Sequence, residues 1–591
     1  MLALPRGTDK PARVRWKLPP WTVESDDWVR IDRELDADHP ARIAAAIVGR
    51  LDLAPLERTY AGLGSEALPP GLLLALVLYE LDRGEPGPAR WAVHARENDP
   101  VKWLTFGLRP AASTLYAFRE RVGPLLDGFN RQLLERAIAA GLTTAERAAG
   151  DGTFVPALGS RHRLVDAAAL ARRLEQLEAE LAAEAAAGPA ADPARPPEAA
   201  PPGELDGPPP SRPAAAEPPP GPPPAAGDGP ATVAESADSG PPPGPSAATT
   251  SPGPTRPAWM AKTPAGRRSQ HGRHRRAAAE LRRRLARHRA TRSKRAVSRR
   301  RPDDRVRICP SEPEAVLGRD KLKVFRPLYN VQLARDLESP LILAYDVVPQ
   351  ANDAGRFGPL LDRAARLSGR ELKEVVVDSA YASQVDLRIA QRRGVVVYAP
   401  AAGAGAAGAD RREPAAPPGG PPAGRRQPAV LPKESFAWLE AEATYVCPAG
   451  HRLELVGRGR EGREGGEEVG YRQYRCPPRH CRECPLAARC TKAPQKGRTI
   501  KRSDEEELVE ALRRRMGEES GRQRYRLRKQ TVELGNADFK AHRGLTRFRS
   551  FGLERAKAQI GLLVLAHNGK ALVKALDEPG RGDVTSNNEA A

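Results

Sequence analysis

The sequence has no long apolar run and few aromatic residues. No stretch approaches the roughly 18 apolar residues that cross a bilayer, and residues 1–17 lack the apolar segment of a signal peptide. We therefore expect no membrane segment and a cytoplasmic location. Only 5% of the 591 residues are aromatic, whereas 60 are proline and 53 are glycine. Part of the chain is expected to lie outside any packed core.

Cysteine is also scarce, and its distribution is informative. The chain has six cysteines, and five of them fall between Cys447 and Cys490. In a cytosolic protein such a cluster favours a metal site over disulfides. Cys481 and Cys484 have zinc-knuckle spacing. Four thiolates, from Cys447, Cys481, Cys484 and Cys490, would close a tetrahedral Zn²⁺ site, with Cys476, His451 and His480 as spare ligands. The alternative is that reduced thiols pack as small apolar groups.

Acidic residues are nearly absent from one long segment. Between Lys262 and Arg301 there are 17 Lys and Arg residues and one acid, Glu280, so this segment supplies +16 of the formal charge of +21. A block of this density repels itself and attracts phosphate, which indicates a nucleic-acid partner. The alternative is a solvated tail that binds nothing specifically.

The first 146 residues read as helical. His39 and Pro40 open a helix that runs to about Arg50. The run 72–78 is apolar nearly all round, which predicts a buried helix. Such a bundle suits a DNA-binding or dimerisation module, and it suits a scaffold equally well.

Later segments predict an α/β layer. Residues Pro189 to Pro257 contain 24 of the 60 prolines and predict a disordered linker. Strand-like runs follow at 328–334, 341–348 and 374–377, and they alternate with helical patterns, which indicates a partly parallel sheet. The end of the chain is expected to be helical from about residue 504 to 576, with a break near Gly544.

Three acids that lie far apart in the sequence are the candidate catalytic residues. Asp151 lies in a Gly-Asp-Gly-Thr segment. Asp378 follows an apolar run and would reach the carboxyl edge of the sheet, where ligands gather in α/β folds. It could instead cap the following helix. Asp346 and Asp353 are rival carboxylates.

The third acid, Glu533, lies in a basic helical stretch. In an α-helix Lys529, four residues earlier, and Lys540, seven later, would fall near the same face. These cations would keep the carboxylate ionised and could contact the scissile phosphate. The alternative is an ordinary surface ion pair. Asp151, Asp378 and Glu533 together could hold two Mg²⁺ ions for in-line displacement at phosphorus.

Several short motifs occur in an order that identifies a family. They are Asp-Gly-Thr at 151–153, Tyr-Asn-Val-Gln at 329–332, the loop 350–353, Val-Asp-Ser-Ala-Tyr at 377–381, the helix from Val532 through Lys540 to Phe548, and Ala-His-Asn at 566–568. With these motifs the chain resembles bacterial insertion-sequence DDE transposases with a tyrosine-arginine-glutamate-lysine signature. The resemblance is closest to members that have a helical amino-terminal domain and a cysteine-bearing insertion.

The resemblance implies an RNase H-like mixed sheet with flanking helices. It also implies metal-dependent cleavage and strand transfer of insertion-sequence ends, with Asp151, Asp378 and Glu533 holding Mg²⁺ or Mn²⁺. The partners would be terminal inverted repeats and target DNA, bound by a homodimer in the bacterial cytoplasm at the nucleoid. The clustered cysteines match the family's pattern, which supports one structural Zn²⁺.

The expected organisation follows from the resemblance and the composition. The parts are a helical amino-terminal domain (1–146), the first part of the core (147–165), a helix and linker (166–258), a basic segment (259–305), the main core (306–401), a flexible linker (402–433), the cysteine-rich insertion (434–500), carboxy-terminal core helices (501–577) and a tail (578–591).

Some residues depart from the family's pattern. Lys529 stands where the signature has arginine, and Tyr525 lies one residue too far from it. Residues 147–150 make a poor strand, and 311–315 replace a motif that is usually built on aspartates. Two other functions therefore stay open: a non-catalytic DNA-binding protein derived from a transposase, and a metal-dependent nuclease without strand transfer.

Overall fold

A computed structural model of the chain describes residues 14–577, except for 61, 63–65, 86, 187–255, 293–299, 321, 401–429 and 463–467. The linker predicted at 189–257 lies outside the described residues apart from Arg256 and Pro257, and so do most of the second linker and the tail. The chain divides into two compact units, residues 172–272 and the rest. None of the described helices is long and apolar enough to cross a membrane.

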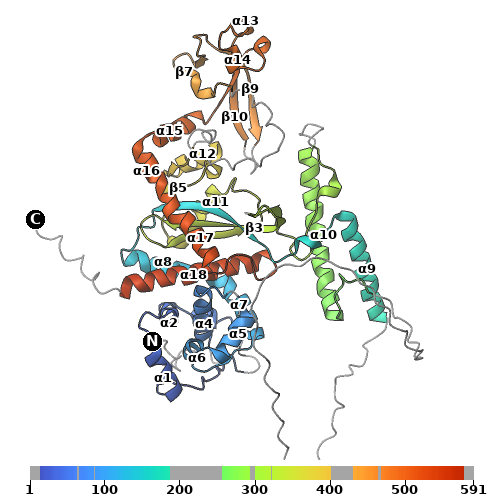
Figure 1. Cartoon of the computed structure of the whole chain (residues 1–591), viewed down its shortest axis with the longest axis vertical. Helices are drawn as coiled ribbons and strands as arrows, with labels where there is room; N and C mark the ends of the chain where they lie inside the picture. The colour runs from blue at the N-terminus through green and yellow to red at the C-terminus, as the bar shows by residue number, and fades with distance from the viewer. Residues whose placement is uncertain are drawn as a thin grey trace, which may run out of the picture. The chain divides into compact units, whose positions relative to one another are not determined.

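The amino-terminal part is a bundle of helices (blue in Figure 1). Its helices are α1 (Asp26–Glu34), α2 (Pro40–Gly49), α3 (Ala54–Glu57), α4 (Pro70–Asp82), α5 (Pro88–Glu97), α6 (Asp99–Thr105), α7 (Ala112–Val122) and α8 (Leu126–Ala139). His39 caps α2, because its Nδ1 accepts a hydrogen bond from the Ala41 amide at 3.1 Å. Helix α4 begins at a proline and is buried on all sides over most of its length, as the all-round apolar pattern predicts.

The main sheet has six strands and is mixed. Its strands are β1 (Arg147–Pro156), β2 (Val316–Arg319), β3 (Phe325–Asp336), β4 (Ile342–Val348), β5 (Glu374–Val376) and β6 (Val396–Tyr398). Strand β1 is central, because it pairs antiparallel with β3 on one side and parallel with β5 on the other. Strand β6 continues the parallel part, while β2 and β4 pair antiparallel with β3. Helices α11 (Phe357–Ser368) and α12 (Gln384–Arg392) connect the later strands.

The expectation of a poor strand at residues 147–150 was wrong. Ala148 and Ala149 are fully buried, and both pair with β3 and β5. Gly150 continues the strand at a point where a Cβ atom would lie 2.9 Å from Leu360 of α11 and 3.0 Å from Val377. Small residues are therefore required here, because α11 packs closely against the centre of the sheet.

The cysteine-rich insertion has small sheets of its own. Its elements are β7 (Ala437–Leu439), β8 (Thr444–Val446), β9 (Glu454–Gly462), β10 (Glu468–Arg475), α13 (Pro478–Arg482), α14 (Ala487–Cys490) and β11 (Thr499–Ser503). Trp438, Tyr445 and Tyr474 pack with ring centroids 4.9–5.7 Å apart. These aromatic rings share a small buried cluster with Cys476, Cys481 and Cys490.

The carboxy-terminal segment is helical with one irregular turn. Helices α15 (Glu506–Gly517) and α16 (Glu519–Arg528) lead into a π-helical turn, η8 (Lys529–Glu533), then α17 (Leu534–Ala541) and α18 (Leu553–Asp577). Helix α18 contacts α2, α4 and α8 of the bundle and also β4 of the sheet (Figure 1). One buried apolar cluster therefore runs from the bundle into the sheet.

The second unit takes most of α9 (Ala167–Ala186) and the start of α10 (Pro264–Arg292). Within it Glu178 accepts a 3.0 Å hydrogen bond from His271, and Glu184 pairs with Arg267. The rest of α10 belongs to the first unit, where Ala277 and Leu281 pack against Ile308. The basic segment is therefore helical over much of its length.

Candidate active site

Asp151 lies in the middle of the central strand. Its Oδ1 accepts a 2.6 Å hydrogen bond from Arg528, and its Oδ2 accepts a 2.9 Å bond from Asn536 of α17. Burial raises the pKa of Asp151, and the nearby carboxylates Asp378 and Asp353 raise it further, whereas Arg528 lowers it. A partly buried acid that has two other acids within electrostatic range is suited to binding cations.

Asp378 lies at the end of the neighbouring parallel strand. Ala149 of β1 pairs with Val376 of β5. Asp151 and Asp378 each lie two residues further along the chain, so the two acids lie at the same level of the sheet. The Asp378 Oδ1 accepts a 2.8 Å hydrogen bond from the Ala380 amide and caps a short 3₁₀ turn. Capping and an active-site position are thus compatible, because one oxygen forms the cap while the side chain lies at the sheet's carboxyl edge.

Glu533 approaches these acids through an irregular helix. In an α-helix residues 528 and 533 would point about 140° apart. The turn Lys529–Glu533 is π-helical, with hydrogen bonds between residues five apart, so both side chains lie on one face. Arg528 forms an ion pair with the half-exposed Glu533 and another with Asp151. Arg528 therefore links Glu533, the third acid, to Asp151 on the sheet.

The two predicted lysines occupy different environments. Lys540 donates hydrogen bonds to the Thr153 hydroxyl at 2.6 Å and to the Phe154 carbonyl at 3.2 Å, so it lies against β1 close to Asp151. Lys529 is exposed at the start of the π-helical turn. The structure places Arg528, which directly precedes Lys529, against the acids. The contact of Lys529 with a DNA phosphate stays a prediction.

The π-helical turn also accounts for the spacing of Tyr525. The sequence placed Tyr525 one residue too far from Lys529. Arg528 lies three residues after Tyr525, and the wider turn accommodates the one additional residue between Arg528 and Glu533. A single sequence gives little indication of a π-helical turn. The adjacent basic residues Arg528 and Lys529 were nevertheless a visible signal, because either of them could be the signature cation.

A fourth carboxylate, Asp353, adjoins the site. Its Oδ1 accepts 2.7 Å hydrogen bonds from Asn330 and from Gln332 of β3. It lies so close to Gly152 that a Cβ atom there would come within 2.0 Å of Oδ1, which explains glycine after Asp151. The other rival, Asp346, lines a separate cavity of about 360 Å³ beside Arg363.

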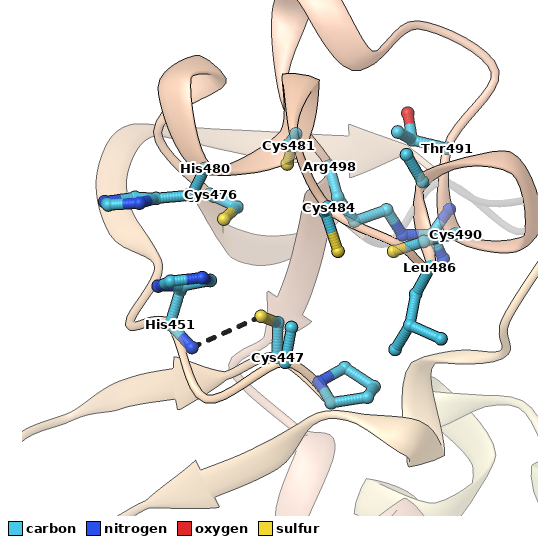
Figure 2. A pocket seen from close by; sticks show the side chains of 13 residues that line it. Cys447, His451, Cys476, His480, Cys481, Cys484, Leu486, Cys490, Thr491 and Arg498 are labelled. Atoms are coloured by element: carbon cyan, nitrogen blue, oxygen red, sulfur yellow. Dashed lines mark hydrogen bonds between the residues drawn. The ribbon is translucent and has the colours of Figure 1, made fainter.

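The cysteine cluster forms a second candidate site. Figure 2 shows Cys447, Cys476, Cys481, Cys484 and Cys490 around one cavity of about 20 Å³. That volume is comparable to one water molecule or ion. The Cys447 Sγ accepts a 3.4 Å hydrogen bond from the His451 amide, and the rings of His451 and His480 stack at 4.2 Å.

The thiols of this cluster influence one another. Burial raises the pKa of Cys476, and the neighbouring Cys481 and Cys447 raise it further. The pKa of Cys490 is also raised by burial, and Arg498 opposes the shift. Thiols that disfavour one another's ionisation would be stabilised as thiolates by a bound cation. Cys309 is buried elsewhere and bonds to Ser311.

Within the described ranges, no group of three or more His, Cys, Asp or Glu side chains is placed so that it could hold a metal ion. The donor types nevertheless fit. Carboxylate oxygens suit Mg²⁺ and Mn²⁺, and thiolates suit Zn²⁺. At the acids, a buried cation of the protein itself, Arg528, contacts two of the oxygens.

Comparison with protein families matches residues 446–573 to the model described as Transposase DDE domain. This segment, 128 of the 591 residues, is similar to a transposase DDE domain. The match confirms the resemblance to DDE transposases and indicates transposase function. No curated protein matches the chain. No solved structure matches it.

The matched range holds part of the candidate site. It contains Arg528, Glu533 and Lys540, together with the clustered cysteines. Asp151 and Asp378 lie outside it, in β1 and just after β5. Asp151 is linked to the matched range by its ion pair with Arg528 and its hydrogen bond from Asn536. The transposase DDE domain thus supplies the helix that carries Glu533, and an earlier segment supplies the sheet beneath it.

Proposed function

We propose that this protein is a DNA transposase that cleaves and joins phosphodiester bonds at the ends of an insertion sequence. The observation that carries the proposal is that two acids from distant segments, Asp151 and Glu533, form ion pairs with one buried cation, Arg528, and that Asp378 lies on the neighbouring parallel strand within electrostatic range of it. The transposase DDE domain supports this function. The strand order and the parallel β1–β5 pair support an RNase H-like core.

Asp151, Asp378 and Glu533 would hold the divalent ions. Two bound Mg²⁺ or Mn²⁺ ions supply activation of the attacking oxygen and stabilisation of the leaving oxygen. Asn536 orients Asp151 by donating to its Oδ2. Lys540 and the exposed Lys529 carry positive charge on either side of Glu533, which suits binding of DNA phosphates.

We further propose that the cysteine insertion holds one structural Zn²⁺ through Cys447, Cys481, Cys484 and Cys490. Cys476 lies with them and is the fifth thiol of the cavity. The insertion's buried core consists partly of cysteines, so a bound ion would replace the stabilisation that a larger apolar core provides. The DNA partner would be held by a pair of such chains, one on each end of the element.

The central experiment compares Asp378→Asn with Asp346→Asn. The full chain is incubated with Mg²⁺ or Mn²⁺ and DNA that includes the sequences flanking its own coding region. We expect the unmodified chain to nick this DNA. Asp378→Asn should abolish nicking while DNA binding persists, because the substitution removes a metal ligand and leaves the basic surfaces intact. Asp346→Asn, an equal charge change at a separate cavity, should keep activity.

The DNA products of this reaction distinguish a transposase from the two other candidate functions, a nuclease and a non-catalytic DNA-binding protein. Joining of cut ends to a target DNA distinguishes a transposase from a nuclease. Full nicking by Asp378→Asn would remove the catalytic assignment. The alternative of a non-catalytic DNA-binding protein is favoured by one observation, the ion pairs that Arg528 forms with two of the acids. It predicts DNA binding with no nicking by the unmodified chain.

A further inference from the structure

Arg528 is the buried cation at the centre of the candidate site. Its side chain is 11% exposed and that of Asp151 is 16% exposed, so their 2.6 Å ion pair is largely screened from water. The second Nη atom pairs with Glu533. Asp378 is close enough to interact electrostatically with the same guanidinium. One arginine therefore interacts favourably with all three acids.

We propose that Arg528 occupies, in the resting protein, the position between the acids that the metal ions take, and that its release is coupled to metal entry. This inference rests on the proposed function. The oxygens Asp151 Oδ1 and Glu533 Oε1 bind either the guanidinium or a divalent ion, because both cations use the same lone pairs.

The π-helical turn makes this arrangement possible. It brings residues five apart onto one face, so the planar fork of Arg528 reaches Glu533 on its own helix and Asp151 on β1. The fork is incompletely bonded, since the buried Nε of Arg528 has no hydrogen-bond partner in the described part of the chain. An arginine held only through its Nη atoms can leave more readily than one that is bonded on all its nitrogens.

A released Arg528 would bind a DNA phosphate. Guanidinium binds phosphate through paired hydrogen bonds, as it binds carboxylate. DNA would then withdraw the arginine from the acids and raise the affinity of the site for metal. By linkage, metal would raise the affinity for DNA by the same factor. Neither effect is expected of an arginine that only stabilises the fold.

The test measures Mn²⁺ binding by the full-length chain without DNA, from the electron paramagnetic resonance signal of free Mn²⁺. The variants are Arg528→Gln, Arg528→Lys and the control Arg526→Gln, whose side chain is 69% exposed on the same helix. We expect Arg528→Gln to bind Mn²⁺ roughly tenfold to a hundredfold more tightly, which corresponds to one or two lost charge-assisted hydrogen bonds. Arg528→Lys should be intermediate, and Arg526→Gln should resemble the unmodified chain.

A second arm adds a short DNA duplex. DNA should tighten Mn²⁺ binding by the unmodified chain and should have a smaller effect on Arg528→Gln. Circular dichroism confirms folding, and if Arg528→Gln fails to fold, Arg528→Lys decides the matter, because a lysine cannot bridge Asp151 and Glu533 in the same way.

Three outcomes would overturn the inference. Equal Mn²⁺ affinity in Arg528→Gln and the unmodified chain would show that the arginine does not compete. Weaker affinity would show that it organises the acids for metal. In both cases Asp378→Asn should still reduce Mn²⁺ binding, and the proposed function survives. Absence of Mn²⁺ binding in every variant would overturn the inference and the proposed metal site together.

Discussion

At the scale of single residues, the turn between Arg528 and Glu533 contains one residue more than an α-helix would place between two side chains on the same face. Gln530 is the residue in this turn that we consider the additional one. It is exposed within the π-helical turn. The segments on both sides of the turn are anchored to β1, by Arg528 and by Asn536, which both bond to Asp151. A π-helical turn of this kind absorbs an inserted residue locally and leaves the flanking helix in register.

Deleting Gln530 should therefore be tolerated. The turn would become α-helical, the former Arg528 and Glu533 would be four residues apart on one face, and both anchors to β1 would keep their positions. We expect a free energy of unfolding within about 1 kcal/mol of the unmodified chain, measured by urea unfolding. Deleting Gln523, which is exposed in the regular α16, should be strongly destabilising, because it rotates every later residue by about 100°.

Comparable destabilisation by the two deletions would show that the π-helical turn is a rigid requirement of the site. Loss of DNA nicking with stability unchanged would show that the extra residue serves activity alone. The first result would contradict the view that the turn absorbs an insertion.

The residues of the candidate site differ in how far the sequence alone predicts their positions. The position of Asp378 at the sheet edge was predictable, because an apolar run that ends in an acid is typical of a strand with a carboxylate at its carboxyl end. The position of Arg528 was not predictable, because an ideal α-helix places Lys529, four residues before Glu533, on the same face as that acid. The contacts of Asp353 with Asn330 and Gln332 depend on the pairing of β3 with β1, which no local pattern shows.

At the scale of elements, periodicity predicted helices better than it predicted the central strand. The buried helix at 72–78 and the strands after residue 328 appear where the pattern indicated them. Strand β1 was weakly predicted, because alanine and glycine have low strand propensity when judged locally. Strands β3 and β5 and helix α11 lie so close to residues 148–150 that only small residues fit, so tertiary packing overrides the low local strand propensity.

The cysteine insertion is the element whose stability should depend on metal. We expect the purified chain to contain about one Zn²⁺ per molecule, measured by plasma mass spectrometry. Cys481→Ser should lose the ion and loosen the insertion, seen as faster hydrogen exchange in β10 and α13, because the small core depends on the thiols. Cys309→Ser is the matched control and should keep the ion.

Full zinc content in Cys481→Ser would exclude that thiol as a ligand and point to Cys476 in its place, since both line the cavity. A chain without zinc that still shows slow exchange in β10 would favour thiols that pack as small apolar groups.

At the scale of the whole molecule, α18 joins the helical bundle to the sheet. It contacts α2, α4 and α8 as well as β4, and Asn568 on it exchanges hydrogen bonds with the Ile342 backbone at 2.8 and 2.9 Å. Asp82, at the end of α4, binds both Arg543 and Lys570 at 2.7–2.8 Å. We therefore expect the bundle to unfold together with the sheet that carries the candidate active site.

This continuity predicts that a substitution between α18 and α2 weakens the sheet as well. A Cβ atom on Gly569 would lie 2.7 Å from Ile47, so Gly569→Ala should force the helices apart and cost about 1–3 kcal/mol. Hydrogen exchange should accelerate by a similar factor in α2, α4 and β4, because these elements open together. Gly128→Ala is the control, since a Cβ atom there meets nothing within 4 Å and alanine favours a helix. Faster exchange confined to α2 and α4 would mean that the bundle unfolds independently, and the sheet with its acids would then be a separate folding unit.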